Sequence, residues 1–167
     1  MVDKIFLGLG SNVGDRKEYL LKSVEKLNNS KKCKVINSSS VYETSPFGVI
    51  NQQNFLNAVI EIKCDYSANE LFELVKKIEV ELGRTPSLKK WGPREIDIDI
   101  LFYNQLIYNQ DNLNIPHSEI LKRDFVLVPL IEIAPTFVHP IYKKRMSEFD
   151  VSEIEHHIIH KLDYKLI

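Results

Sequence analysis

The stretch KKWGPREIDIDILFY, Lys89–Tyr103, places two aspartates, Asp97 and Asp99, inside an isoleucine-rich run. Side chains of a β-strand alternate between its two faces. One face is apolar and is expected to belong to the core: Ile96, Ile98, Ile100 and Phe102. The two aspartates share the other face, with Cα atoms roughly 6.5–7 Å apart, which is twice the rise per residue. Carboxylates beside an apolar core are costly unless a partner compensates their charge, so this strand predicts such a partner.

Two carboxylates at this spacing can converge on one metal ion or bracket two. Oxygen ligands favour a hard cation, and Mg²⁺ is the usual one when phosphates complete its shell. The upstream segment GRTPSLKKWGPR carries four basic residues: Arg84, Lys89, Lys90 and Arg94. Acidic metal ligands beside a basic segment suit a polyphosphate, with arginine on the free oxygens. The alternative is an edge strand with both carboxylates in solvent, which is the commoner meaning of an isolated D-x-D motif.

The glycine-rich segment GLGSNVGDR, residues 8–16, does not have the ending or the spacing of a phosphate-binding loop. If the protein binds a nucleotide, metal and arginines must therefore hold its phosphates.

Hydrophobic periodicity predicts the other elements. We expect strands over residues 3–10 and 54–64, an extended segment over 34–44, and helices over 14–29 and 67–83. Local signals mark the helix ends: Asp15 is a predicted N-cap, Ser67 and Glu70 form a capping box, and Gly83 ends the second helix.

The chain after the acidic strand is expected to turn at Asn104–Gln105 into a short partner strand, as in a hairpin. An apolar run follows over 125–135, and the tail 147–162 has the pattern of a final amphipathic helix. The order β-α-β-β-α-β with additions predicts an α+β, ferredoxin-like fold: an antiparallel sheet flanked by helices, with extra C-terminal elements.

The chain has 167 residues, of which 44% are apolar and 27% charged, with a formal net charge of −1. This suits one domain over residues 1–167, with no room for a second enzyme. The near-neutral charge gives no reason to expect nucleic acid or a membrane as partner. No apolar stretch could span a bilayer, and the first residues do not form a signal peptide. Cys33 and Cys64 are expected to be reduced thiols, so we predict a cytoplasmic protein.

Several motifs together resemble the 6-hydroxymethyl-7,8-dihydropterin pyrophosphokinase family of folate biosynthesis. KWGPREIDIDIL resembles its signature, and further segments follow in the family's order: GLGSN, YETSPFG, FLNAVIEI, IEVELGR, IPH and the apolar run from Arg123. The resemblance covers nearly the whole chain and implies a ferredoxin-like fold. It also implies ATP as co-substrate and two Mg²⁺ ions. We expect the protein to be a monomer. The implied reaction transfers the β,γ-pyrophosphoryl group of ATP to the pterin hydroxymethyl oxygen and releases AMP.

The resemblance also implies roles for single residues. Asp97 and Asp99 would hold Mg²⁺ and act in catalysis with Arg84 and Arg94. The implied ATP-binding residues are Arg84, Trp91, Arg94, Ile100, Leu113, His117 and Arg123. The implied pterin-binding residues are Thr44, Ser45, Phe47, Phe55, Asn57, Asp97 and Phe125. Phe55 and Phe125 would lie on the two faces of the pterin ring, and Glu79 would be a structural or binding carboxylate.

Some positions depart from the family pattern. Pro86 stands where a second arginine is common. Either Lys89 or Lys90 takes the place of that arginine, or phosphate binding and release are tuned differently. Ser118 stands where an aromatic residue is common on the adenine side, and Ser45 where a proline is common.

The basic segment lies between a strong helix and a strong strand. We expect Arg84–Pro93 to be a mobile loop that brings Trp91 over the site when both substrates are bound.

The residues alone leave other functions open. One is a ferredoxin-like module that binds RNA or a regulatory ligand without catalysis, although the RNA-binding strand motif is absent. Another is a Mg²⁺-dependent nucleotidyl or phosphoryl transferase with a different acceptor. His156 and His160 would lie one helical turn apart, and we interpret them as part of a surface helix.

Overall fold

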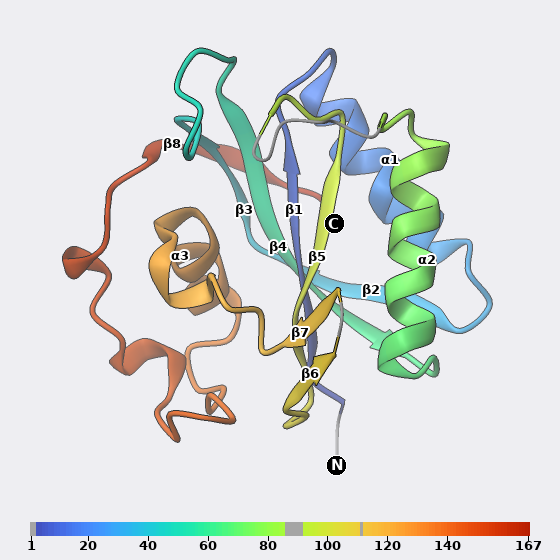
Figure 1. Ribbon diagram of the computed structural model, residues 1–167, viewed down its shortest axis with the longest axis vertical. Helices are drawn as coiled ribbons and strands as arrows, with labels where there is room; N and C mark the ends of the chain where they lie inside the picture. Colours follow the sequence, from blue (N-terminus) through green and yellow to red (C-terminus); the bar gives the residue numbers. More distant parts are fainter. Residues whose placement is uncertain (1–2, 86–91, 111) are drawn as a thin grey trace.

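The computed structural model describes residues 3–85, 92–110 and 112–167 (Figure 1). The strands of the main sheet are β1 (Ile5–Ser11), β2 (Cys33–Ser38), β3 (Ser40–Thr44), β4 (Phe55–Cys64), β5 (Asp97–Tyr103) and β8 (Ile158–Lys165). Across the sheet the order is β5-β1-β4-β3-β8, with β2 also paired to β4. The pairings of β1 with β4 and β5, and of β4 with β2 and β3, are antiparallel.

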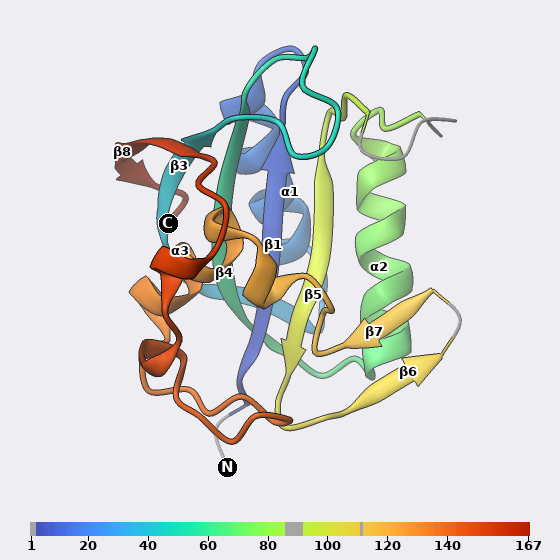
Figure 2. The same ribbon diagram turned by 60° about the vertical axis from the view of Figure 1, so that its left-hand side comes forward.

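Helices cover both faces of this sheet. α1 (Arg16–Asn28) and α2 (Ala68–Glu81) lie on one face, and α3 (Asp124–Ile133) lies on the other (Figure 1, Figure 2). Each side has its own apolar core, one shared with α1 and α2 and one with α3. The predicted ferredoxin-like α+β fold is confirmed. No helix in the described ranges is long and apolar enough to cross a membrane.

The side chains of β5 alternate between an apolar and an acidic face as predicted, as far as a register shift next to Ile100. Ile98 and Ile100 are buried in the core beneath α1 and α2, so Asp97 and Asp99 face the side of α3. Phe102 was expected beside the isoleucines, and that prediction is wrong. The pairing of β5 with β1 shifts register next to Ile100, and Phe102 joins Leu101 in the core under α3. An extra residue in one strand reverses the alternation that follows it.

The predicted helix ends are confirmed. The Asp15 side chain accepts a hydrogen bond from the Glu18 N–H at the start of α1. Ser67 and Glu70 form both hydrogen bonds of the capping box of α2. Gly83 follows α2 with a φ of 95°, a conformation that costs glycine little. This end geometry directs the chain from α2 towards Arg84.

Replacing Ser67 with alanine should lower the free energy of unfolding by about 1 kcal/mol, since one N-terminal N–H of α2 loses its acceptor. Urea unfolding followed by circular dichroism measures the change. Ser147→Ala, at an exposed serine in the 3-10 helix Met146–Glu148, is the control and should leave the free energy unchanged. Equal stability of the two variants would mean that the cap contributes nothing.

The expected hairpin after β5 is only partly correct. The chain turns at Asn104–Gln105 as predicted. The next strand, β6 (Tyr108–Gln110), pairs with β7 (Leu113–Ile115) in a separate small sheet. Asn104 instead ties the turn to the start of β1, because its N–H donates to the Lys4 carbonyl and its side chain accepts from the Lys4 N–H.

The predicted C-terminal helix over 147–162 is wrong. The tail forms the 3-10 helices Met146–Glu148 and Val151–Glu153 and then β8, which pairs with β3 at the edge of the sheet. β-branched residues suit a strand, and the open edge of β3 supplies backbone partners that an isolated helix pattern does not reveal. His156 and His160 are therefore not separated by a helical turn, and His160 is paired with Glu43.

Candidate active site

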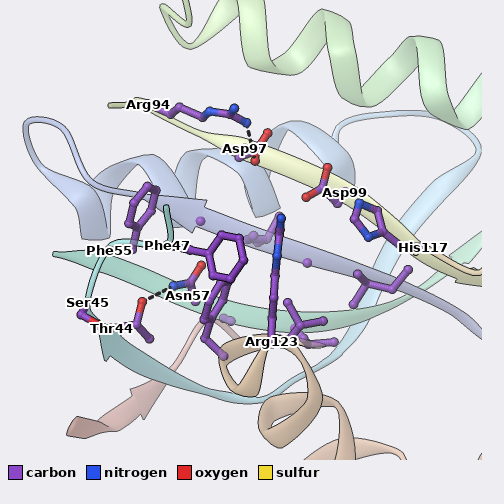
Figure 3. Close-up of a pocket in the computed structure, with 18 of the residues that line it drawn as sticks. Thr44, Ser45, Phe47, Phe55, Asn57, Arg94, Asp97, Asp99, His117 and Arg123 are labelled. Atoms are coloured by element: carbon purple, nitrogen blue, oxygen red, sulfur yellow. Dashed lines mark hydrogen bonds and ion pairs between the residues drawn. The ribbon is translucent and has the colours of Figure 1, made fainter. Parts of the chain in front are cut away.

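Two cavities meet at β5. The first, of about 260 Å³, lies between the sheet and the start of α3 (Figure 3). All of the residues implied for the pterin line it: Thr44, Ser45, Phe47, Phe55, Asn57, Asp97 and Phe125. The second, of about 690 Å³, lies on the side of α2. Most of the residues implied for ATP line this second cavity: Arg84, Arg94, Ile100, Leu113 and His117.

Some predicted residues fall elsewhere. Arg123 lines the first cavity and not the second. Ser118, which stands where the family commonly has an aromatic residue on the adenine side, lines the second cavity. Pro86, Lys89, Lys90 and Trp91 lie outside the described residues.

The amide of Asn57 is held in one orientation at the end of the first cavity. Its Nδ2 donates to Thr44 Oγ1 at 2.7 Å, and the side chain is buried (Figure 3). Its Oδ1 lies where a side chain on Gly10 would be, since a Cβ there would approach Oδ1 to 2.7 Å. Glycine in β1 therefore leaves this carbonyl free to face the cavity as a hydrogen-bond acceptor.

Aromatic rings and a guanidinium form another wall. The rings of Phe47 and Phe125 meet edge to face with centroids 6.4 Å apart. The Arg123 guanidinium lies 4.8 Å from the Phe47 centroid, and the side chain extends from the start of α3 towards β5 (Figure 3). A flat apolar surface beside a cation can stack on a heterocycle and attract an anion next to it.

Asp97 is the anion of a small ion-pair network. Its two oxygens accept from Arg84 at 3.0 Å and from Arg94 at 2.8 Å. Burial disfavours its charge, but Arg94 and Arg84 outweigh that effect and hold the pKa of Asp97 below its usual value. Arg84 also pairs with Glu79, a buried carboxylate of α2 whose other oxygen accepts from the Ile98 N–H at 2.8 Å. The network fixes both arginines beside the acidic strand.

Asp99 has a different environment. Within the described residues, no hydrogen bond or ion pair is made to its carboxylate, and the residue is partly buried. Burial, reinforced by the charge of Asp97, raises the pKa of Asp99 to about 6. A cation that approaches this carboxylate would stabilise its charged form.

His117 offers a neutral donor near the carboxylates. Its Nδ1 accepts from the Glu119 N–H at 3.2 Å, so the proton of the neutral ring is assigned to Nε2. Burial and then the charge of Arg123 lower the pKa of His117. The ring lines both cavities, where its N–H can donate to a phosphate oxygen.

The donor set suits a hard cation that is shared with a ligand. Within the ranges that the structure describes, no group of three His, Cys, Asp or Glu side chains is placed to bind a metal by itself. Asp97 and Asp99 supply oxygen ligands from one face of β5, and phosphate oxygens would have to complete the shell, as is usual for Mg²⁺. These two residues therefore fit Mg²⁺ that arrives with a polyphosphate.

The sequence analysis missed two residues at the site. Lys76 of α2 lines the second cavity and pairs with Glu79 at 3.1 Å. The two residues are three positions apart in a predicted helix, and this spacing could have indicated the ion pair from the sequence. Asn12, at the end of β1, is the second residue. Its Oδ1 accepts from the Arg94 N–H at 2.8 Å, and its Nδ2 donates to Gln52 and to the carbonyl of Gln53.

Asn12 thus joins two segments that carry cavity residues. Its own N–H also donates to the Arg94 carbonyl at 3.0 Å. These bonds tie the Arg94 backbone to the end of β1 and to the chain that precedes β4. A buried amide with its donors and acceptor paired in this way is a strong positional constraint.

Fold and site together define a ferredoxin-like α+β protein with acidic and basic side chains placed for phosphate chemistry. The chain matches the model of the 7,8-dihydro-6-hydroxymethylpterin-pyrophosphokinase (HPPK) family over residues 6–135, and it belongs to that family.

Several curated relatives support this membership. The chain is 48% identical over 145 residues to 2-amino-4-hydroxy-6-hydroxymethyldihydropteridine pyrophosphokinase of Aquifex aeolicus, covering 87% of this chain and 89% of the relative. It is 44% identical over 128 residues to the protein of the same name in Bacillus subtilis, covering 77% and 76%.

Solved structures agree in fold. A Plasmodium falciparum HPPK-DHPS structure with pteroate superposes with a TM-score of 0.69 at 17% identity, covering 87% of this chain. The chain spans 41% of that protein. At this identity the likeness shows the fold alone.

Proposed function

We propose that this protein transfers the pyrophosphoryl group of ATP to the hydroxymethyl oxygen of 6-hydroxymethyl-7,8-dihydropterin, a step of folate biosynthesis. The observation that carries the proposal is the junction of the two cavities. Arg94, Asp99 and His117 line both of them. A group bound in one cavity can therefore meet a group bound in the other beside two charges and a neutral donor.

The first cavity suits the pterin. Asn57 presents an amide oxygen to the edge of a heterocycle, and Thr44 keeps that amide in place. Phe55 from β4 and Phe125 from α3 both line the cavity, in keeping with aromatic contact to the ring faces.

The second cavity suits the nucleotide. Ile100 and Leu113 provide apolar contact for a base, while Lys76, Arg84 and Arg94 provide positive charge for phosphates. The adenine would lie beside β7 and the phosphates would extend towards β5.

The reaction moves one pyrophosphoryl group. A bond forms between the pterin hydroxymethyl oxygen and the β-phosphorus of ATP, the bond between that phosphorus and the oxygen of the α-phosphate breaks, and AMP leaves. The hydroxyl proton passes to solvent. Positioning and charge stabilisation account for most of the catalysis in such transfers. Arg84 and Arg94 would stabilise the phosphate charge that develops, and His117 would donate through Nε2 to a phosphate oxygen.

Asp97 and Asp99 would hold Mg²⁺, with two ions proposed, and bound Mg²⁺ would neutralise phosphate charge and polarise the hydroxyl. For Asp97 this requires that its ion pairs with Arg84 and Arg94 open, which frees the Arg94 guanidinium for phosphate and leaves Arg84 paired with Glu79.

The test is product analysis. Incubation with ATP, Mg²⁺ and hydroxymethyldihydropterin should yield AMP and the pterin diphosphate, separated by ion-exchange chromatography. ADP as product would indicate an ordinary kinase, and pyrophosphate would indicate nucleotidyl transfer. No turnover together with tight ligand binding would support a binding module.

Replacing Phe125 with alanine should weaken pterin binding by about 1–3 kcal/mol, the range for stacking on a heterocyclic base. Titration calorimetry with pterin alone and with an ATP analogue alone measures both affinities, and the nucleotide affinity should hardly change. Tyr142→Ala, at an exposed aromatic residue that lines neither cavity, is the control. Equal losses for both ligands would show that Phe125 only stabilises the fold.

The remaining assignments are part of the same proposal. We propose one domain over residues 1–167 that works as a monomer in the cytoplasm. Gel filtration with light scattering tests the oligomeric state.

A further inference from the structure

At His157 the C-terminal tail passes next to residues that line the first cavity. This part of the chain lies beyond residue 135, where the match to the family ends. The His157 side chain is almost completely buried. Asp124, the first residue of α3, accepts hydrogen bonds from the N–H groups of His157 and Ile158 at 2.8 and 2.9 Å. The tail is therefore fixed to α3 immediately before β8 begins.

His157 contacts the chain at the end of β3 through backbone and side chain. Its carbonyl accepts from the Ser45 N–H at 2.8 Å. Its Nδ1 lies 3.1 Å from Ser45 Oγ, within hydrogen-bond distance. Ser45 lines the first cavity, so a residue of the tail determines where this part of the cavity wall lies.

The imidazole ring also supports the aromatic wall. Its centroid lies 5.4 Å from that of Phe47 and 5.8 Å from that of Phe125. These two rings line the cavity, whereas His157 does not. The histidine lies behind them, where its ring limits their movement away from a ligand.

We propose that His157 is a positioning residue for the pterin side of the active site. This inference rests on the proposed function. Through Ser45, Phe47 and Phe125 it holds three parts of the cavity wall that come from two distant segments of the chain. A wall fixed before binding loses less conformational entropy when the ligand arrives, and this raises affinity. The tail would thereby set pterin affinity without touching pterin or ATP.

The experiment compares His157→Ala with the wild type. His156→Ala is the matched control, because His156 is the exposed neighbour in the same tail. His157→Phe keeps a ring, and His157→Asn keeps a polar atom near the position of Nδ1, so the two separate packing from hydrogen bonding. The readouts are the pterin Kd without nucleotide, the ATP-analogue Kd without pterin, both KM values, kcat, and the melting temperature.

For His157→Ala we expect the pterin Kd and the pterin KM to rise about threefold to tenfold, as for loss of one buried hydrogen bond and its packing. The nucleotide Kd and the KM for ATP should stay within about twofold of the wild type. His157→Phe and His157→Asn should each recover part of the affinity. Ser45→Ala combined with His157→Ala should weaken binding by less than the product of the two separate effects.

An unchanged pterin Kd in folded His157→Ala would overturn the inference, and so would equal losses for pterin and nucleotide. If His157→Ala does not fold, the same criteria apply to His157→Asn and His157→Phe. The wild-type assay separates this inference from the proposed function. If the wild type forms AMP and the His157 variants bind pterin as tightly as the wild type, only the role of His157 is refuted. If the wild type forms no AMP, the proposed function itself is refuted.

Discussion

Replacing Asp99 with asparagine is expected to lower turnover by on the order of 10³-fold or more while the ligand-free protein becomes more stable. Asparagine keeps the size of the side chain but removes the charge that would hold Mg²⁺. The gain in stability follows from burial. The pKa of Asp99 is raised to about 6 in the folded protein, against about 3.9 in an unfolded chain.

The pH dependence of this gain can be derived from the two pKa values. The folded state binds the Asp99 proton more tightly than the unfolded state does, so the contribution of Asp99 to stability is fully present below about pH 4 and is lost as the pH rises through about 6. The asparagine variant escapes this loss. Its melting temperature should exceed that of the wild type by a few degrees at about pH 8 and match it at about pH 4.

Asp97→Asn is the matched variant, and its stability should change in the opposite direction. Asp97 accepts from Arg84 and Arg94, so its loss leaves two guanidinium groups without that partner and should lower the melting temperature at neutral pH. Turnover should fall as far as for Asp99→Asn. Differential scanning fluorimetry and AMP release at limiting Mg²⁺ measure both quantities. Near wild-type activity in either variant would disprove the assignment of that carboxylate to the metal.

Arg94→Ala is expected to lower kcat by roughly 10²–10⁴-fold, the range for removing a positioned group that stabilises charge in a transition state. Arg94 lines both cavities, and Asn12 fixes its backbone on one side through two hydrogen bonds. The affinity for ATP without pterin should fall much less, because most of the interaction develops during transfer.

Single-turnover measurement of AMP formation isolates this effect from product release. Arg145→Ala removes an exposed arginine that lines neither cavity and should leave the rate unchanged. A loss of only a few-fold in Arg94→Ala would mean that the ion pair with Asp97 is the main role of the residue. Arg94→Lys should recover little, because an ammonium group lacks the fork that contacts two phosphate oxygens.

Much of this molecule follows from short-range patterns. The alternation in β5 separates Ile98 and Ile100 from Asp97 and Asp99, and the structure keeps that separation. The capping box of Ser67 and Glu70 begins α2 where the pattern placed it. Both patterns depend on residues within a few positions of each other, so they can be recognised in the sequence from backbone geometry alone.

Tertiary structure decided the parts that depend on distant partners. The tail, which has a helical sequence pattern, forms the strand β8 because it pairs with the edge of β3. A register shift between β5 and β1 places Phe102 in the core under α3. The same long-range packing brought the cavities together at Asp99 and placed His157 behind Phe47 and Phe125. Local periodicity carries no information about which strand edge stands open or which side chain lies behind a wall, because those contacts join residues far apart in the chain.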